Sequence, residues 1–306
     1  MKGKFKFLGI LLAVTLLFTA CGKGGSDTES TEGAGNETTA TEEASNKTTG
    51  GMEGMISVVS REEGSGTRGA FVELVKVEDK DGNDATSVEA VIQNNTEAVM
   101  TTVAGEKSAI GYISLGSLND TVKALKIDDV EATAENVSNG SYKISRPFNI
   151  VTKEEPTGAE ADFIGFILSE EGQKIVEEEG YVKSPEAKDY TPDESASGSI
   201  AIAGSSSVTP VMEKLVEAYK NVNANVKIQV NMSDSTTGVQ SVKDGIAQIG
   251  MASRELKDSE KDLNKVVIAM DGIAVIVNKD NSLDSISMDN LKSVYLGEIE
   301  NWEDVK

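Results

Sequence analysis

The sequence predicts an α/β protein in which helices cover a β-sheet. From residue 55 onward, short apolar runs rich in β-branched residues alternate with stretches whose apolar residues recur at helical spacing. The stretch 210–221 shows this spacing clearly, with Val211 and Leu215 on one helix face. Such alternation is typical of sheets covered by helices, and it places several strand-to-helix turns at one sheet edge.

Taken in chain order, the apolar runs and periodic stretches predict seven strands and seven helices. The strands are expected at 56–59, 110–114, 147–151, 200–203, 226–232, 266–269 and 273–277. The helices are expected at 67–76, 86–103, 159–169, 171–179, 210–221, 238–246 and 288–296.

Residues 1–21 have the pattern of a targeting segment. Three lysines precede the apolar run 7–18, and Thr19-Ala20-Cys21-Gly22 follows as a small-residue cleavage site. This arrangement resembles the lipobox of bacterial lipoproteins, in which the cysteine is lipidated, with palmitate among the expected chains, and becomes the mature N-terminus. The alternative is an ordinary secretory signal with a chance cysteine. The lipobox interpretation predicts a lipid-anchored protein on the extracytoplasmic face of the cell membrane.

Two segments have the composition of linkers. Residues 22–54 contain no aromatic residue, Ile, Leu or Val, and their seven acids outnumber two lysines. Such a segment is unable to bury a core, so we expect a disordered tether. Residues 184–199 combine two prolines with the run Ser195-Ala196-Ser197-Gly198-Ser199 and predict a surface connection.

The composition excludes several classes of function. The chain has no histidine and one cysteine, at the predicted lipidation position, so histidine-dependent triads, disulfides and zinc thiolate sites are ruled out. We therefore expect a protein that is not an enzyme and that holds no metal or cofactor. The formal net charge of −22 makes nucleic acid a poor partner, although a small anion can still bind local N–H groups.

The turn after the first predicted strand has the parts of an oxyanion site. Arg61 is followed by Ser65, Gly66 and Thr67, just before a predicted helix. Backbone N–H groups, small hydroxyls and a guanidinium at a helix N-terminus are suited to holding a tetrahedral oxyanion. The alternative for Arg61 is a surface ion pair with one of the two glutamates that follow it.

Similar turns occur later in the chain. Two of them join a predicted strand to a predicted helix: Gly204-Ser205-Ser206-Ser207 and Ser235-Thr236-Thr237-Gly238. A third turn with a weaker signal ends at Ser253-Arg254. A single turn of this kind has a simpler explanation, because Ser and Thr are preferred helix N-caps. Taken together, the later turns add five candidate anion ligands: Ser205, Ser206, Ser207, Ser235 and Ser253.

These turns together resemble the phosphate-binding subunit of bacterial ABC phosphate importers. The resemblance rests on the three turns and on supporting runs: Ile249-Gly250-Met251-Ala252-Ser253-Arg254-Glu255-Leu256, Ala109-Ile110-Gly111-Tyr112, Tyr295-Leu296-Gly297-Glu298-Ile299 and Asn301-Trp302. It implies a two-lobed, type II periplasmic-binding-protein-like fold with a ligand cleft between the lobes. It also implies a monomer that takes inorganic phosphate into the cleft, with Arg61 as a bidentate donor, and delivers it to the membrane permease.

The order of the motifs departs from the family. The Gly-Ser-Ser-Ser turn comes early in the family, whereas here the Arg61 turn comes first, which predicts a circular permutation. The usual ends would be joined through 184–199. One lobe is then expected at 146–272 and the other at 55–145 plus 273–306. The alternative is a fragment of two fused copies or an assembly error.

The chemistry departs from the family at one position. Ser253 stands where many members have an Asp that accepts the proton of monohydrogen phosphate. Because a hydroxyl both donates and accepts, discrimination against sulfate is expected to be weaker or to come from Glu63 or Asp234. Two alternatives therefore stay open: a receptor for another oxyanion such as sulfate or molybdate, and a phosphate-sensing surface lipoprotein without a transport role.

Overall fold

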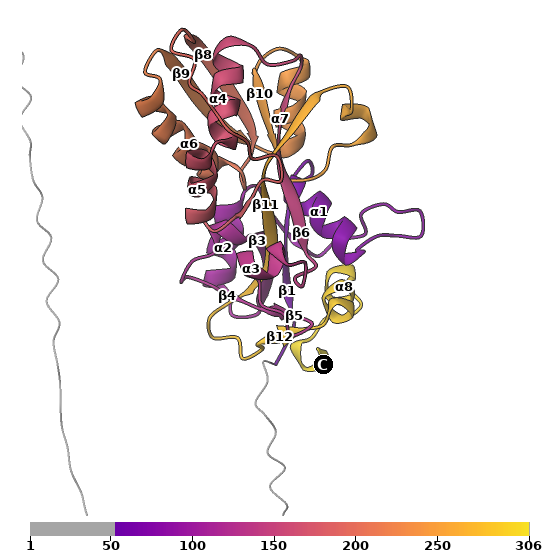
Figure 1. Cartoon of the computed structure of the whole chain (residues 1–306). Helices are drawn as coiled ribbons and strands as arrows, with labels where there is room; N and C mark the ends of the chain where they lie inside the picture. Colours follow the sequence, from indigo (N-terminus) through magenta and orange to yellow (C-terminus); the bar gives the residue numbers. More distant parts are fainter. Residues whose placement is uncertain (1–52, 306) are drawn as a thin grey trace, which may run out of the picture. The chain divides into compact units, whose positions relative to one another are not determined.

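The computed structural model describes residues 53–305 and confirms the predicted α/β class (Figure 1). The predicted signal peptide, Cys21 and nearly all of the predicted tether lie outside the described residues. Helices lie on both sides of a central sheet that runs through the whole described region (Figure 1).

The main sheet has its strands in the order β2-β1-β3-β11-β6-β10-β8-β9. The short strands β4 and β7 pair with β11, and β5 pairs with β12 in a separate two-stranded sheet. The strands are β1 (Ser57–Arg61), β2 (Val91–Gln93), β3 (Ala109–Ser114), β4 (Lys123–Ala124), β5 (Lys126–Ile127), β6 (Ser145–Thr152), β7 (Val182–Lys183), β8 (Gly198–Ser205), β9 (Val226–Ser233), β10 (Ile249–Ala252), β11 (Asn264–Val277) and β12 (Ser285–Ile286).

Six of the seven predicted helices are confirmed to within a few residues, and one is wrong. The helices are α1 (Gly66–Val75), α2 (Thr96–Gly105), α3 (Ala134–Ser138), α4 (Gly158–Leu168), α5 (Glu170–Glu178), α6 (Thr209–Val222), α7 (Ser235–Lys243) and α8 (Met288–Leu296). The predicted helix 86–103 instead contains β2, then a turn, and then α2. The strands predicted at 266–269 and 273–277 are one continuous strand, β11.

The buried apolar side chains form separate clusters along the sheet. The largest cluster takes its residues from between Phe148 and Ala269, and includes the α6 side chains Val211 and Leu215, both fully buried. A second large cluster takes its buried residues from Ala70 to Ile144 and from Ile273 to Trp302. The two clusters thus divide the chain where β6 begins and again within β11.

The antiparallel strands β6 and β11 connect the parts of the sheet that carry these two clusters (Figure 1). Arg146 on β6 lies opposite Asp271 on β11, and the guanidinium donates to Asp271 Oδ2 from Nε at 3.2 Å and from Nη2 at 2.9 Å. Asp271 Oδ1 also accepts from Ser114 Oγ and from the Leu115 N–H. Complete burial nevertheless raises the pKa of Asp271 to about 6.

The first and last described segments are hydrogen-bonded to each other. Met55 and Asn301 form an antiparallel bridge, beside which the Ile56 N–H donates to the Glu300 carbonyl at 2.8 Å. The Trp302 N–H donates in turn to the Gly54 carbonyl at 3.0 Å. Strand β1 therefore starts next to the segment that follows α8.

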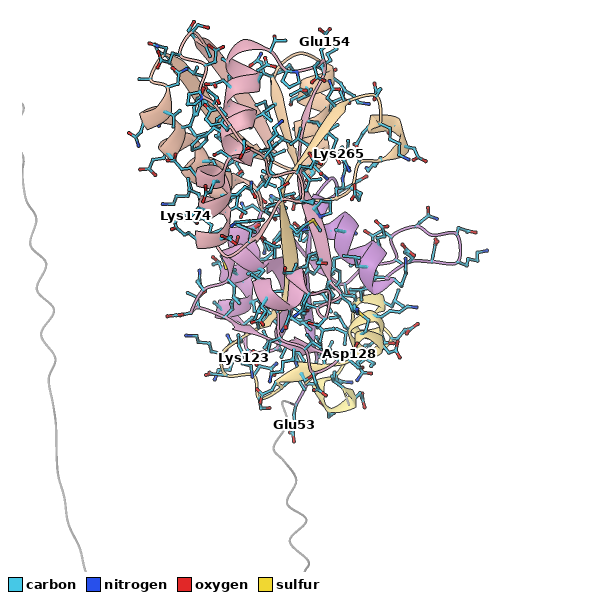
Figure 2. All side chains as sticks on the ribbon, in the orientation of Figure 1. Glu53, Lys123, Asp128, Glu154, Lys174 and Lys265 are labelled. Carbon is cyan, nitrogen blue, oxygen red and sulfur yellow. The ribbon has the colours of Figure 1, made fainter. Side chains whose placement is uncertain are left out.

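Most charged side chains, unlike Arg146 and Asp271, lie at the periphery of the described region. Glu154 and Lys174 are exposed and point outward (Figure 2). Within residues 53–305, no helix has the length and apolar character needed to cross a membrane. Residues 184–197 contain neither helix nor strand, and most of their side chains are exposed.

Candidate anion-binding site

Four strand-to-helix turns converge on one site. Strands β1, β2, β8 and β9 lead directly into α1, α2, α6 and α7, and Ser253 follows the end of β10. Because β2 and β9 run parallel to the neighbouring β1 and β8, their carboxyl ends lie beside those of their neighbours. Parallel strand ends followed by helix N-termini are the usual place for anions in open α/β sheets.

The first turn is held by a buried tyrosine and by its own helix cap. Tyr112 stacks on Phe71 with ring centroids 4.0 Å apart, and its hydroxyl shares a hydrogen bond of 2.8 Å with Ser60 Oγ at the end of β1. Ser65 is the N-cap of α1, because its hydroxyl accepts from the Arg68 N–H at 3.3 Å. Capping thus accounts for part of the role of Ser65, which is also almost completely buried.

The second turn leaves the N-terminus of its helix without a side-chain cap. Helix α6 has no side-chain hydrogen bond at its N-cap. The hydroxyls of Ser206 and Ser207 lie close to Thr96 Oγ1 instead. Gly204 has a φ of 136°, and a Cβ there would lie 2.3 Å from the Met251 carbonyl oxygen. Only glycine therefore allows β8 to approach β10 so closely at this turn.

The third turn is capped by a carboxylate. Asp234 caps α7, accepting from the Thr237 N–H at 2.9 Å and from the Thr237 hydroxyl at 2.5 Å. The Ser235 hydroxyl is therefore free to accept from the Ser253 N–H at 3.1 Å. Glu63 is exposed. Capping of α7 by Asp234, and the exposure of Glu63, argue against either carboxylate as a substitute for the aspartate of the family.

Hydroxyl groups from all of these turns contact one another. Thr67 Oγ1 and Ser207 Oγ share a hydrogen bond of 2.9 Å, and Ser205 Oγ donates to Ser253 Oγ at 2.9 Å. Ser253 Oγ also lies 3.4 Å from Ser235 Oγ. We refer to this buried group as the cradle; its members are Arg61, Thr67, Thr96, Ser205, Ser206, Ser207, Ser235 and Ser253.

Arg61 supplies the charge of the cradle. Its side chain is 2% exposed, its Nη2 donates to Ser206 Oγ at 3.1 Å, and its Nε and Nη2 form a two-point ion pair of 2.7 Å with Glu62. The alternative of an ion pair with a following glutamate is thus correct for Glu62, but the guanidinium is buried rather than on the surface, and Glu62 is partly buried. Nη1 is buried with no hydrogen-bond partner, so this guanidinium keeps one unused donor group.

Gly66 lets the walls of the cradle come together. A Cβ at Gly66 would lie 2.3 Å from Ser235 Oγ and 2.7 Å from Ser253 Oγ. Next to it, the Gly64 carbonyl accepts from both the N–H and the hydroxyl of Thr236. The structure therefore brings all nine predicted ligand positions to one place, with Ser65 acting as a cap and Gly66 as the point of close approach.

Sequence reasoning missed Thr96. This residue begins α2, is 5% exposed, and its hydroxyl lies 3.4 Å from Ser206 Oγ and 3.3 Å from Ser207 Oγ. The available signal was Asn95, whose side chain caps α2 by accepting from the Ala98 N–H at 2.8 Å. An Asn-Thr-Glu run after a short apolar pair marks a helix start that the predicted helix 86–103 concealed.

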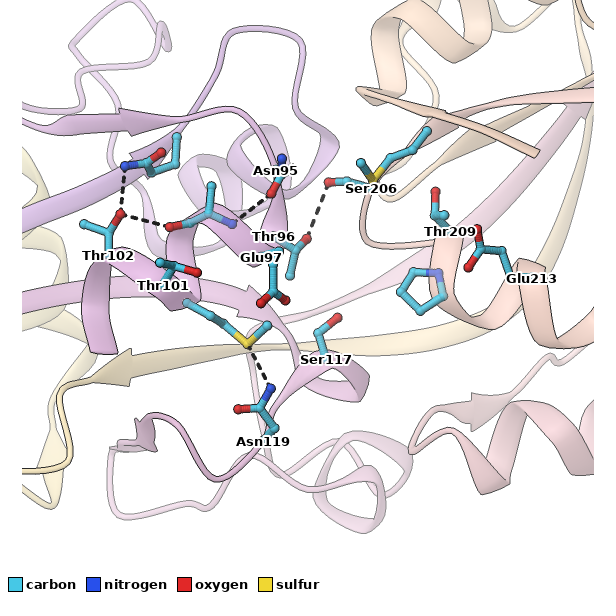
Figure 3. A pocket seen from close by; sticks show the side chains of 15 residues that line it. Asn95, Thr96, Glu97, Thr101, Thr102, Ser117, Asn119, Ser206, Thr209 and Glu213 are labelled. Carbon is cyan, nitrogen blue, oxygen red and sulfur yellow. Dashed lines mark hydrogen bonds between the residues drawn. The ribbon is translucent and has the colours of Figure 1, made fainter. Parts of the chain in front are cut away.

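A cavity of about 890 Å³ opens beside the cradle (Figure 3). One wall comes from α2 and the turn at 117–119, and the other from the start of α6 and from Met232. Ser206 and Thr96 line this cavity as well as the cradle. Within residues 53–305, no group of three or more acidic, Cys or His side chains is arranged to hold a metal ion.

This fold and site are those of a solute-binding protein, and comparisons with known proteins agree. The family described as "PBP superfamily domain" matches residues 33–171 and 190–306. The phosphate-binding protein PstS 2 of Streptococcus agalactiae is 53% identical over 260 residues, covering 83% of this chain and 88% of the relative. A crystal structure of the phosphate-binding protein of a phosphate ABC transporter from Streptococcus pneumoniae TIGR4 is 46% identical, with a TM-score of 0.67, covering 83% of this chain and 100% of that chain.

The phosphate-binding protein PstS of Bacillus subtilis is 36% identical over 141 residues, which are 45% of each chain. The chain therefore belongs to the PstS family of phosphate-binding proteins within the PBP superfamily.

Proposed function

We propose that this protein captures inorganic phosphate and delivers it to the membrane permease of an ABC importer. The observation that carries the proposal is a group of seven buried hydroxyls, one of which, Ser206, accepts from a buried guanidinium whose Nη1 has no partner. An unused charged donor beside an uncapped helix N-terminus is complementary to a tetrahedral anion. The relatives named for phosphate binding and phosphate transport support the same ligand and partner.

The binding energy would come from many charge-assisted hydrogen bonds. Hydroxyls of the cradle, N–H groups at the start of α6 and the free Nη1 of Arg61 would donate to phosphate oxygens. Each hydrogen bond to a charged group contributes about 1.5–3 kcal/mol. After desolvation and closure costs, several such bonds are sufficient for the roughly −8 kcal/mol of micromolar binding.

We infer that the cradle closes between two lobes. The division of the buried apolar clusters supports one lobe at 146–272 and another at 55–145 plus 273–306. Strands β6 and β11 would then carry the hinge, and Arg61 and Thr67 would face Ser206 and Ser207 across the cleft. Closure would bury the anion and present both lobes to the permease.

We infer that the chain is a natural circular permutant. A match spanning 83% of this chain and 88% of the Streptococcus agalactiae relative requires the same segment order in both. The match to the Bacillus subtilis relative spans only 45% of each chain, as expected when one order is rotated against the other. The family match is interrupted between 171 and 190, which overlaps the predicted joint at 184–199.

We also propose that Cys21 carries a lipid anchor, which would hold a monomeric protein on the extracytoplasmic face of the cell membrane. The pattern of the first 21 residues supports this location. The absence of histidine from the sequence and the names of the relatives as binding proteins support a function without catalysis.

The test is isothermal titration of the purified protein, stripped of bound anion, with phosphate. We expect one-to-one binding at micromolar affinity or tighter, and its loss in Arg61→Ala. A matched control is Lys257→Ala, which removes an exposed cation from a separate surface pocket that also includes Ser65 and Thr236, and leaves the cradle intact. A well-folded protein without phosphate affinity would overturn the proposal.

A receptor for another oxyanion is the second candidate, and it is favoured by Ser253. Every side-chain acceptor in the cradle is a hydroxyl, and the neighbouring carboxylate of Glu62 is occupied by Arg61. Titration with sulfate and molybdate tests this candidate directly. We expect Ser253→Asp to weaken sulfate binding at least tenfold more than phosphate binding, because a carboxylate repels an anion that carries no proton.

A further inference from the structure

A pair of hydrogen bonds outside the cradle joins the two inferred lobes. The Gly64 carbonyl accepts from the Thr236 N–H at 3.2 Å and from Thr236 Oγ1 at 3.1 Å. Gly64 belongs to the lobe that contains 55–145, and Thr236 belongs to the lobe at 146–272. Neither residue is a member of the cradle, so this contact can be altered without the removal of an anion ligand.

Gly64 is held tightly against the first turn of α7. Its φ is 91°, in the left-handed region that favours glycine. A Cβ at this position would lie 2.6 Å from Asp234 Oδ1 and 3.5 Å from Thr236 Cβ. Asp234 is the N-cap of α7, and Thr236 lies in the first turn of that helix. Backbone conformation and close packing therefore direct the Gly64 carbonyl toward Thr236.

A buried ion pair supports Thr236 from its own lobe. Arg254 Nη2 donates to Thr236 Oγ1 at 3.4 Å. The same guanidinium donates to both carboxylate oxygens of Glu260, at 2.7 Å and 2.9 Å, and both side chains are 7% exposed. The Arg254 carbonyl accepts from Asn149 Nδ2 at 2.7 Å. Glu260 and strand β6, which carries Asn149, thus fix the donor that reaches Thr236.

The guanidinium determines the direction of the threonine hydroxyl. An arginine side chain donates hydrogen bonds and accepts none, so Thr236 Oγ1 must accept from Arg254. The hydroxyl hydrogen is then left for the Gly64 carbonyl. Hydrogen bonds in series polarise one another, and a charged donor strengthens them. This chain of hydrogen bonds ends on the turn that carries Arg61, the charged group of the cradle.

We propose that this chain is an interlobe latch, in which Thr236 and Arg254 are positioning residues for phosphate binding. The latch consists of Gly64, Thr236, Arg254 and Glu260. It holds the lobes together once the anion has entered the cradle, and it slows release of the anion without contacting it. This inference rests on the proposed function, because the latch closes the same cleft around the same anion.

The test measures affinity and release of phosphate on the same purified protein. Isothermal titration gives Kd, and a chase of bound radiolabelled phosphate with unlabelled phosphate, followed by rapid filtration, gives the dissociation rate. We expect Thr236→Val to raise both by about fivefold, because it removes one hydrogen bond of the latch and none to the anion. The association rate, calculated from the two, should stay within about twofold.

Two variants of the same turn are the controls. Thr236→Ser keeps the hydroxyl and should restore the dissociation rate to within about twofold of the wild type. Thr237→Val is the matched control, because its hydroxyl donates to Asp234 rather than to Gly64. Equal acceleration of release in Thr237→Val and Thr236→Val would overturn the latch, since it would show a general effect on α7.

A second variant tests whether Arg254 acts through the hydroxyl. Arg254→Lys keeps a cation beside Glu260 but loses the second, planar donor group, so it should also speed release. The double variant Thr236→Val/Arg254→Lys should release phosphate no more than about twofold faster than Thr236→Val, because no hydroxyl is left to orient. Fully additive effects would contradict the chain of hydrogen bonds.

The outcomes separate the latch from the proposed function. If the wild type binds phosphate and Thr236→Val releases it at the wild-type rate, the latch is wrong and the proposed function stands. A weaker Kd that comes from slower association would also contradict the latch, which acts on the closed form. If the wild type does not bind phosphate, both proposals fail.

Discussion

Two buried arginines in this protein each form a two-point ion pair with a carboxylate, and in each one Nη1 has no hydrogen-bond partner. Arg61 lies in the turn after β1, and its partner Glu62 is 16% exposed. Arg146 lies on β6, and its partner Asp271 is 0% exposed. The pairs are chemically similar but lie in different surroundings.

The surroundings decide what each pair can do. Asp271 is held by Arg146, Ser114 and the Leu115 N–H, so it joins β6 and β11 to the end of β3. Arg61 is held by a neighbour in its own turn, and beyond it lie hydroxyls that can rotate toward a ligand. A buried guanidinium therefore indicates a ligand site where hydroxyls and helix N-termini surround it, and indicates architecture where strands surround it.

The largest expected effect is on stability, at Arg146. Arg146→Met leaves Asp271 buried without its cation, which costs about 3–5 kcal/mol at pH 7.5. Chemical denaturation at pH 7.5 and pH 5 measures it, and the cost should be smaller at pH 5 because the carboxyl is protonated there. Lys107→Met is the control, since its pair with Asp280 is on the surface and contributes about 1 kcal/mol or less. Equal losses of unfolding free energy in Arg146→Met and Lys107→Met would contradict the structural role assigned to the Arg146–Asp271 pair.

The next effect is the pH dependence of the wild-type protein. The pKa of Asp271 is raised to about 6 by burial, from 3.8 in an unburied aspartate, so the folded state binds more protons between pH 4 and 6. Stability from this group is fully present below about pH 4 and is lost as pH rises through about 6, by up to about 3 kcal/mol. Subtracting the unfolding free energy of Asp271→Asn from that of the wild type at each pH isolates the contribution of Asp271. If this difference instead grows as pH rises, the attraction of Arg146 outweighs burial and lowers the pKa of Asp271.

The third effect should appear in binding rather than in stability. We expect Arg61→Ala to weaken phosphate binding at least about a hundredfold, equivalent to about 2.7 kcal/mol. Its unfolding free energy without phosphate should fall by less than that of Arg146→Met, because Glu62 is partly exposed and can turn toward solvent. Titration and denaturation of the same preparation check both parts. A large loss of stability would place Arg61 in the same structural role as Arg146.

The smallest effect comes from one methyl group. Gly66→Ala places a Cβ 2.3 Å from Ser235 Oγ, which should hold the walls of the cradle apart. We expect about tenfold weaker phosphate binding with nearly unchanged stability, measured by titration and thermal unfolding. Gly105→Ala, at the end of α2 with open space around it, is the control and should bind normally.

The convergence of the turns could be predicted from the sequence because each turn has a local signature. A strand that leads through Gly and Ser into a helix with apolar periodicity places its hydroxyls at a sheet edge, and this describes Ser206 and Ser235 well. The ion pair of Arg61 could also be predicted from the sequence, since Glu62 is its neighbour. The burial of Arg61 could not be predicted, because it depends on Ser206 and Tyr112 from distant segments.

Two errors have physical causes in tertiary structure. Strand β2 has only three residues, and both Val91 and Ile92 are exposed, so no apolar alternation revealed it. Strand β11 was divided at Asp271-Gly272, a pair that normally interrupts a strand. Here Arg146 compensates the charge, and Gly272 fits against Val137 and Leu115, so the strand continues.

The backbone hydrogen bonds that flank the Met55–Asn301 bridge have a consequence for the chain as a polymer. They close residues 54–302 into a non-covalent ring, in which the backbone just before β1 meets the backbone after α8. Joining these ends with a short peptide would make a cyclic protein without moving either segment. Because the unfolded ring has far fewer conformations than the open chain, cyclisation should raise stability by several kcal/mol.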